Sequence, residues 1–276
     1  MLIARRPDWL IAAESQSARH EERYEPAHYR ERARQMTAAG FDALKFDIDS
    51  IVVLTGEELH RPLHRGEIAR MVECVAAARE GAGPDVDLAV DCHWRFTPAD
   101  ALRIARALAP FDLFWLEDPC PPENWRDMAE LRTRGGCPIL TGENLNRRHG
   151  FWDLIVNRSV DLVAPDLQKC GGLLEGKRIG ELAEMQGIGV APHNIASPLG
   201  TIASAHVCAT LPNFVALEFH GSDVPFWNDL VRFGDSARPV IDRGRIRLPE
   251  APGLGCELDE DVARAYAKPG EAFFDD

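Results

Sequence analysis

The sequence predicts an α/β protein in which parallel strands alternate with helices and close into one β/α barrel. Three observations support this fold class. Apolar runs of strand length alternate with segments of helical period. Polar residues recur at the strand ends with nearly constant spacing, and the length of 276 residues suits a barrel, which takes roughly 250 residues.

Strands are expected where a short apolar run is bounded by polar or turn residues. The eight candidate runs are residues 9–13, 43–48, 88–93, 113–118, 139–143, 162–167, 189–193 and 215–220. Apolar residues at three and four spacing predict helices at residues 27–39, 66–80, 98–108, 125–134, 173–186 and 198–210. Thr97 and Pro98 fit an N-cap followed by proline at the first helical position.

The pattern changes after Phe233. Short pieces punctuated by proline and glycine replace the repeat of strand and helix from there onward. We therefore assign residues 1–233 to the barrel and residues 234–276 to a C-terminal appendage.

The composition limits the classes of partner. Asp and Glu outnumber Lys and Arg by 44 to 31, and a net charge of -13 argues against a nucleic-acid or anionic-membrane surface and favours a small-molecule ligand. The seven cysteines are odd in number and contain no C-x-x-C pair, so we expect a reduced, cytoplasmic protein without disulfides or zinc. The sequence has neither a signal-peptide core nor an apolar run long enough for a membrane span.

Polar residues end six successive predicted strands at intervals of 23 to 27 residues, which is the length of one strand-helix unit. They are Asp91, Glu117, Glu143, Asp166, His193 and Glu218. The C-terminal ends of barrel strands meet at one mouth, so we expect all six at a common site. One such residue alone would be an ordinary solvated loop residue.

Asp91, Glu117 and Glu143 predict a metal site. Three carboxylates brought together raise one another's pKa unless a cation neutralises them. Ligands that are all oxygen favour a hard ion, so we predict one Mg²⁺ and note that Mn²⁺ can use the same ligands. A salt-bridged acidic cluster without metal is the alternative.

Strand alternation adds two further candidates to the mouth. His93 lies two residues after Asp91 and is therefore expected on the same side of its strand, beside a predicted metal ligand. Lys45 and Asp47 form a similar pair on the second predicted strand.

His193 is the candidate general base. Asp166 ends the preceding strand and is placed to orient the imidazole and raise its basicity. Glu218 either hydrogen-bonds a substrate hydroxyl or supports the site, and both readings stay open. His220 has no assigned role.

Several motifs together resemble the barrel domain of the enolase superfamily, in its mandelate racemase/muconate lactonizing enzyme-like branch. They run over residues 40–262 as GFDALKFDID, VDCHWRF, FWLEDP, TGENL, APDLQKCGG, APHNIASPLG, LEFHG and LPEAPGLGCELDED. The resemblance implies a TIM-type barrel of the modified (β/α)7β form. It also implies that Asp91, Glu117 and Glu143 bind magnesium, that Asp166 and His193 form the catalytic dyad, and that Lys45 contacts the substrate carboxylate.

The chain departs from the family pattern in two places. The Lys-x-Lys motif of the racemases is here Lys45-Phe46-Asp47, which removes the usual second base and leaves the role of Asp47 open. His93 instead resembles the histidine that serves as the acid in galactonate- and mannonate-type acid-sugar dehydratases. Few residues precede Gly40, so most of the family's N-terminal capping domain is expected to be absent, and residues 234–276 would normally pack on it.

The resemblance therefore implies a magnesium-dependent hydro-lyase that acts on a small sugar acid and forms a 2-keto-3-deoxy acid. Without the cap we expect weak activity, unless another chain supplies the lid, and we expect a homo-oligomer. The alternatives are an epimerase, racemase or cycloisomerase on the same barrel, a Schiff-base aldolase using Lys169 or Lys45, and a truncated, non-catalytic metal-binding barrel. Which sugar acid is used stays open.

Overall fold

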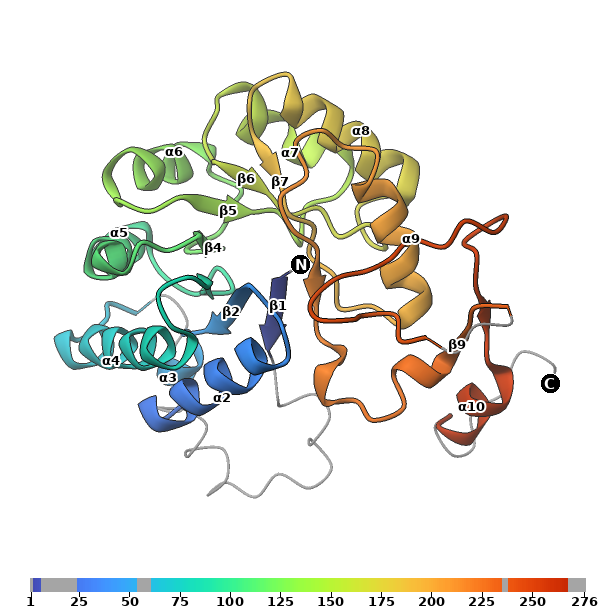
Figure 1. Ribbon diagram of the computed structural model, residues 1–276. Helices are drawn as coiled ribbons and strands as arrows, with labels where there is room; N and C mark the ends of the chain where they lie inside the picture. Colours follow the sequence, from blue (N-terminus) through green and yellow to red (C-terminus); the bar gives the residue numbers. More distant parts are fainter. Residues whose placement is uncertain (1, 6–23, 54–60, 235–237, 268–276) are drawn as a thin grey trace.

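A closed ring of parallel strands surrounded by helices forms the body of the protein in a computed structural model (Figure 1). The structure describes residues 2–5, 24–53, 61–234 and 238–267. Eight strands follow the order β7-β6-β5-β4-β3-β2-β1-β8, and every pairing between neighbours is parallel. A parallel bridge between Val190 and Phe214 joins β7 to the segment before β8 and closes the ring. The predicted barrel is confirmed.

The strands are short and each is followed by at least one helix. The barrel strands are β1 Leu2–Arg5, β2 Ala43–Asp47, β3 Asp87–Asp91, β4 Trp115–Glu117, β5 Ile139–Thr141, β6 Leu162–Val163, β7 Gly189–Val190 and β8 Glu218–Phe219. The helices are α2 Pro26–Ala38, α3 Ser50–Val53, α4 Arg65–Ala82, α5 Pro98–Leu108, α6 Trp125–Arg134, α7 Arg147–Val156, α8 Leu173–Glu184, α9 Pro198–Cys208 and α10 Glu260–Ala265. An antiparallel pair, β9 Val231–Arg232 and β10 Glu257–Leu258, lies beyond the barrel.

Several elements differ from the sequence expectation, since the short elements α3, α10, β9 and β10 were not predicted. The strand expected at residues 9–13 lies outside the described residues, and β1 at Leu2–Arg5 fills the place between β2 and β8. The helix α7 was not predicted. Its first turn is polar and Gly150 interrupts its apolar pattern, yet Phe151, Leu154 and Ile155 bury one face against the barrel. Tertiary packing outweighs local propensity there.

Local signals define the helix starts that the sequence indicated. The Thr97 side chain accepts a hydrogen bond from the backbone N–H of Asp100 at 3.2 Å, and Pro98 occupies the first turn of α5. Ser197 and Pro198 repeat the arrangement at α9. Both helices therefore begin directly after a loop at the barrel mouth.

Two layers of apolar side chains support the mouth. The larger layer fills the space between the strands and the surrounding helices. The smaller layer lies inside the barrel and consists of Ala43, Ala89, Trp115, Leu140, Leu162, Ala164, Ala191 and Ala216. Because five of these side chains are alanine, the barrel axis has room for the indole of Trp115, which is 1% exposed.

None of the helices in the described ranges has the length and apolarity that a bilayer crossing requires.

Candidate active site

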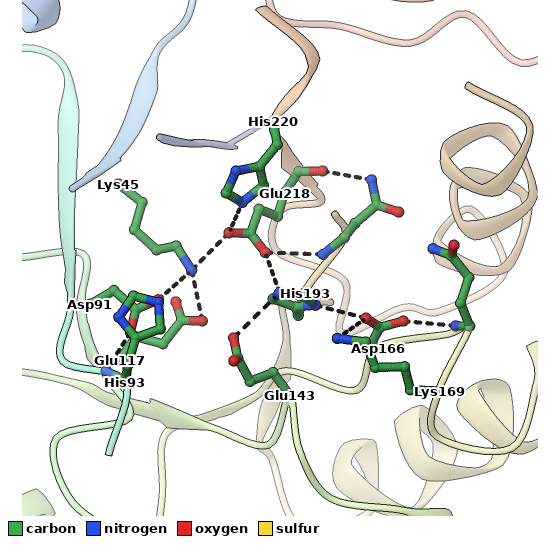
Figure 2. Close-up of polar contacts among 12 residues, drawn as sticks. Lys45, Asp91, His93, Glu117, Glu143, Asp166, Lys169, His193, Glu218 and His220 are labelled. Atoms are coloured by element: carbon green, nitrogen blue, oxygen red, sulfur yellow. Dashed lines mark hydrogen bonds and ion pairs between the residues drawn. The ribbon is translucent and has the colours of Figure 1, made fainter. Parts of the chain in front are cut away.

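The candidate site is a cluster of polar side chains that converge at the barrel mouth (Figure 2). The inner apolar layer lies next to it. At the mouth ends of six strands, a polar residue follows an inner-layer residue by two positions, and both are buried. These polar residues are Lys45, Asp91, Glu117, Asp166, His193 and Glu218, and all are buried. The structure thus brings together the strand-end residues that the spacing singled out, while their chemical roles stay predictions.

Glu143 reaches the same mouth by a different local geometry. It follows the inner-layer residue Leu140 by three positions, and Gly142 between them has φ +135°. A Cβ at Gly142 would lie 2.6 Å from the ring of Phe151. A side chain at this position would therefore be strained and crowded, and glycine allows the chain to turn Glu143 into the site.

The Lys45 ammonium contacts three carboxylates of the site. Its Nζ lies 2.9 Å from Asp91 Oδ2, 2.7 Å from Glu117 Oε1 and 2.8 Å from Glu218 Oε1. Burial by itself lowers the pKa of Lys45, but the surrounding carboxylates outweigh it and hold that pKa well above its ordinary value. Lys45 is therefore charged and neutralises part of the acidic cluster.

Asp91, Glu117 and Glu143 fit a divalent cation by their donor chemistry. Each offers a carboxylate oxygen, and the three oxygens lie within 4.8 Å of one another. Trp115 Nε1–H donates to Glu117 Oε2 at 2.9 Å, and the backbone N–H of His93 donates to Asp91 Oδ1 at 2.9 Å. These bonds orient the ligands, as supporting hydrogen bonds commonly do in metal sites.

The electrostatics of the cluster favour an added positive charge. Burial raises the pKa of Glu117 well above its usual value and also raises the pKa of Glu143. Burial raises the pKa of Asp91 too, but Lys45 outweighs it and the net shift is downward. A hard divalent ion would keep all three carboxylates ionised.

His193 and Asp166 form a close pair. His193 Nδ1 lies 2.8 Å from Asp166 Oδ2, while Lys169 Nζ approaches the same oxygen at 3.1 Å. His193 Nε2 faces the site, 3.4 Å from Glu143 Oε2. Burial lowers the pKa of His193, but Glu218 and Asp166 outweigh it, so the net pKa is raised. The raised pKa favours His193 as a base, and its Nε2 points at the carboxylates of Glu143 and Glu218.

Glu218 is surrounded by donors. Besides Lys45, its carboxylate contacts His220 Nε2 at 2.9 Å and accepts the backbone N–H of Asn194 at 3.0 Å. Burial raises the pKa of Glu218, but Lys45 and His193 outweigh it and leave the pKa well below its usual value. These contacts favour the supporting reading of Glu218. Asn194 was missed, although it directly follows His193 in the sequence.

His93 reaches the site by a turn and not by strand alternation. The strand β3 ends at Asp91, and His93 and Trp94 have φ of 45° and 50°. The ring nevertheless comes close to Asp91, with Nδ1 3.6 Å from Oδ1. Burial lowers the pKa of His93, but Asp91 and the neighbouring carboxylates raise it to about 10. Asp47 lies in the same corner, where Asp47, Asp91 and His93 form a second cluster of metal-type donors.

Comparison with known proteins places the chain in a family. Residues 28–262 match the family described as enolase C-terminal domain-like. The D-xylonate dehydratase of Haloferax volcanii is 43% identical over 247 residues, which are 89% of this chain and 59% of that protein. The D-gluconate dehydratase of Thermoproteus tenax is 30% identical over 251 residues, which are 90% of this chain and 48% of that protein. The chain thus spans less than two thirds of the length of these curated relatives.

The solved structures agree with the sequence comparison. The crystal structure of a mandelate racemase/muconate lactonizing enzyme-like protein from Rubrobacter xylanophilus superposes with a TM-score of 0.84 at 43% identity. The match covers 99% of this chain and 70% of that one. The barrel is accordingly that of the enolase superfamily, and the chain belongs to its mandelate racemase/muconate lactonizing enzyme-like family of C-terminal domains.

Proposed function

We propose that the protein is a sugar-acid dehydratase that depends on a divalent cation. It would remove the proton α to a carboxylate, expel the β-hydroxyl and release a 2-keto-3-deoxy acid. The observation that carries the proposal is the His193–Asp166 pair, whose Nε2 faces the carboxylate cluster at 3.4 Å from Glu143. The relatives named as D-xylonate and D-gluconate dehydratases support the same reaction class.

The two histidines suit opposite halves of the reaction. They follow β7 and β3, which lie four positions apart in the ring of eight strands and so face each other across the mouth. His193, with its raised pKa and its Asp166 partner, would take the α-proton. His93 would donate a proton to the departing hydroxyl, because Asp91 and the neighbouring carboxylates raise its pKa and favour the protonated imidazole.

The electrons and protons balance without a further reactant. The electron pair from the broken α-C–H bond is first held on the substrate carboxylate as an enediolate. It then forms the carbon-carbon double bond when the β-C–O bond breaks and the hydroxyl takes a proton and leaves as water. The resulting enol tautomerises to the 2-keto acid. His193 ends with one proton more and His93 with one fewer, and exchange with solvent restores both.

Asp91, Glu117 and Glu143 would hold the cation, for which we propose Mg²⁺ with Mn²⁺ as a substitute. When bound, such an ion stabilises the negative charge that develops on the substrate carboxylate. Lys45 would contribute a second positive charge to that carboxylate from the floor of the site. Cytoplasmic location, homo-oligomerisation and the role of residues 234–276 stay predictions.

The racemase or epimerase alternative needs a second base opposite His193. His93 lies on that side, and the surrounding carboxylates raise its pKa, which favours an acid over a base. Asp47 replaces the second lysine of the racemases, as the sequence indicated. Dehydration is therefore the better supported of the two reactions, and a non-catalytic metal-binding barrel is the alternative from another class.

The test is a screen of five- and six-carbon sugar acids in D₂O, with Mg²⁺ or with EDTA. We expect at least one acid to give a 2-keto-3-deoxy product by NMR in the presence of Mg²⁺ and none in EDTA. A product that differs from the substrate only in configuration would favour the epimerase. Metal binding without any turnover or α-deuterium incorporation would favour the non-catalytic barrel.

A further inference from the structure

A further carboxylate is buried beside the barrel mouth, and the proposed reaction gives it no role. Asp49 comes two residues after β2, at the start of α3, and is 1% exposed. Its Oδ1 lies 3.1 Å from His93 Nδ1, and its Oδ2 lies 2.6 Å from Arg95 Nε. Arg95 thus compensates the buried charge, and Oδ1 remains directed at the imidazole.

The contact between Asp49 and His93 resembles the contact between Asp166 and His193, the proposed base. Asp166 lies 2.8 Å from Nδ1 of His193, and Asp49 lies 3.1 Å from Nδ1 of His93. In each pair a buried carboxylate contacts Nδ1 of the ring, so Nε2 lies on the side of the ring that faces away from that carboxylate. Within the described part of the chain, no hydrogen bond to Nε2 of His93 is present.

The His93 ring needs such a partner because its backbone does not come from a strand. His93 and Trp94 both adopt left-handed φ, in a turn after β3. Trp94 contacts the ring only edge-on, with centroids 5.9 Å apart, and the His93 side chain keeps 12% exposure. Asp49 makes the shorter polar contact to the ring, at 3.1 Å against 3.6 Å for Asp91 Oδ1, and therefore does most to restrict its rotation. A group that acts on a substrate loses rate steeply when its position is not held.

We propose that Asp49 is a positioning residue that holds the His93 ring by its Nδ1 edge and directs Nε2 at the hydroxyl that leaves the substrate. The inference rests on the proposed dehydration, and it adds a residue that acts through His93 without touching the substrate. Proton removal by His193 does not depend on Asp49, so the two halves of the reaction should respond differently to its loss.

The test compares dehydration with exchange of the α-proton for deuterium in Asp49→Asn. Dehydration should fall about 10- to 100-fold, the usual effect of losing an orienting partner, while exchange stays near the wild-type rate. Asp100→Asn is the matched control, because Asp100 is also buried, at 4% exposure, and pairs with Arg103 at 2.6 Å. The control should leave the ratio of exchange to dehydration unchanged.

A double variant separates positioning from a merely structural role. If Asp49 acts through His93, dehydration in Asp49→Asn/His93→Asn should be no slower than in His93→Asn alone. Multiplied losses, or equal losses of exchange and dehydration in Asp49→Asn, would overturn the proposal. Asp49→Ser, which is smaller and neutral, gives the same comparison should Asp49→Asn not fold.

A readout without substrate keeps this inference distinct from the proposed function. The ¹⁵N resonance of His93 Nδ1, assigned with His93→Asn, should shift in Asp49→Asn and stay in place in Asp100→Asn. An unshifted resonance would overturn the role of Asp49 whatever the enzyme does. A wild-type protein inert to every sugar acid would overturn the proposed function, while the resonance would still decide whether Asp49 holds the ring.

Discussion

Mg²⁺ should raise the melting temperature of the protein, and the coupling of ion binding to folding sets the size of the rise. Three carboxylate oxygens within 4.8 Å of one another form a site that the unfolded chain lacks. An ion that binds only the folded state stabilises it by about 2.7 kcal/mol at 100 times its Kd. An unfolding entropy of about 2.1 cal/mol/K per residue gives roughly 0.6 kcal/mol/K for 276 residues. The Tm should therefore rise by about 4 to 5 °C.

Glu143→Gln should affect the stability of the metal-free protein and the stabilisation by Mg²⁺ in opposite directions. Burial raises the folded pKa of Glu143 above 4.5, although His193 opposes it. The metal-free protein therefore gains most from this group below the unfolded pKa, and loses that stability as the pH rises through the folded pKa. At neutral pH and in EDTA, Glu143→Gln should be at least as stable as the wild type, yet it should lose most of the gain from Mg²⁺.

The assay is thermal unfolding by circular dichroism at neutral pH, first in EDTA and then with increasing Mg²⁺. Glu130→Gln is the control, because Glu130 is an exposed residue of α6 that pairs with Arg134 on the same helix. It should keep the full shift. The absence of a shift at millimolar Mg²⁺, or an equal shift in Glu143→Gln and the wild type, would refute a site built from these carboxylates.

Three other substitutions test the site and its support. His193→Asn should abolish both α-proton exchange and dehydration in D₂O, since neither begins without the base, and full dehydration by this variant would contradict the assignment. His93→Asn should keep exchange but dehydrate about 10²- to 10⁴-fold more slowly, as measured by product formation, and an unchanged dehydration rate would count against it. Gly142→Ala should lower the free energy of unfolding in urea by about 1 to 3 kcal/mol, because φ is +135° and the new Cβ would meet Phe151 at 2.6 Å; a wild-type midpoint would exclude that strain.

The barrel and the set of residues at its mouth were predictable because both follow from a repeat. Each strand-helix unit returns the chain to the same end of the barrel, so residues one unit apart, such as Asp91 and Glu117, must meet. The helix α7 lacked such a signal, since Gly150 and the polar first turn hide the apolar face that Phe151 buries. Formation of α7 depends on contacts with the neighbouring helices and not on the local sequence pattern.

Contacts between loops were the part that the sequence could not supply. Strand alternation predicted His93 on the side of Asp91, but the strand ends at Asp91 and a left-handed turn brings the ring there instead. The partner of that ring, Asp49, is 44 residues away and belongs to another loop. Asp49 is out of register with the strand-end repeat, so no spacing argument connects it with His93.

The central lysine has a consequence for the order of assembly. Lys45 carries a permanent counter-charge into the acidic cluster as part of the chain itself, in contact with Asp91, Glu117 and Glu218. Small zinc domains fold only when the ion binds, because nothing else neutralises their ligands. Here Lys45 supplies a positive charge from within the chain, so we expect the barrel to fold without a divalent ion. An ion at the proposed site would then be able to bind and dissociate while the protein stays folded.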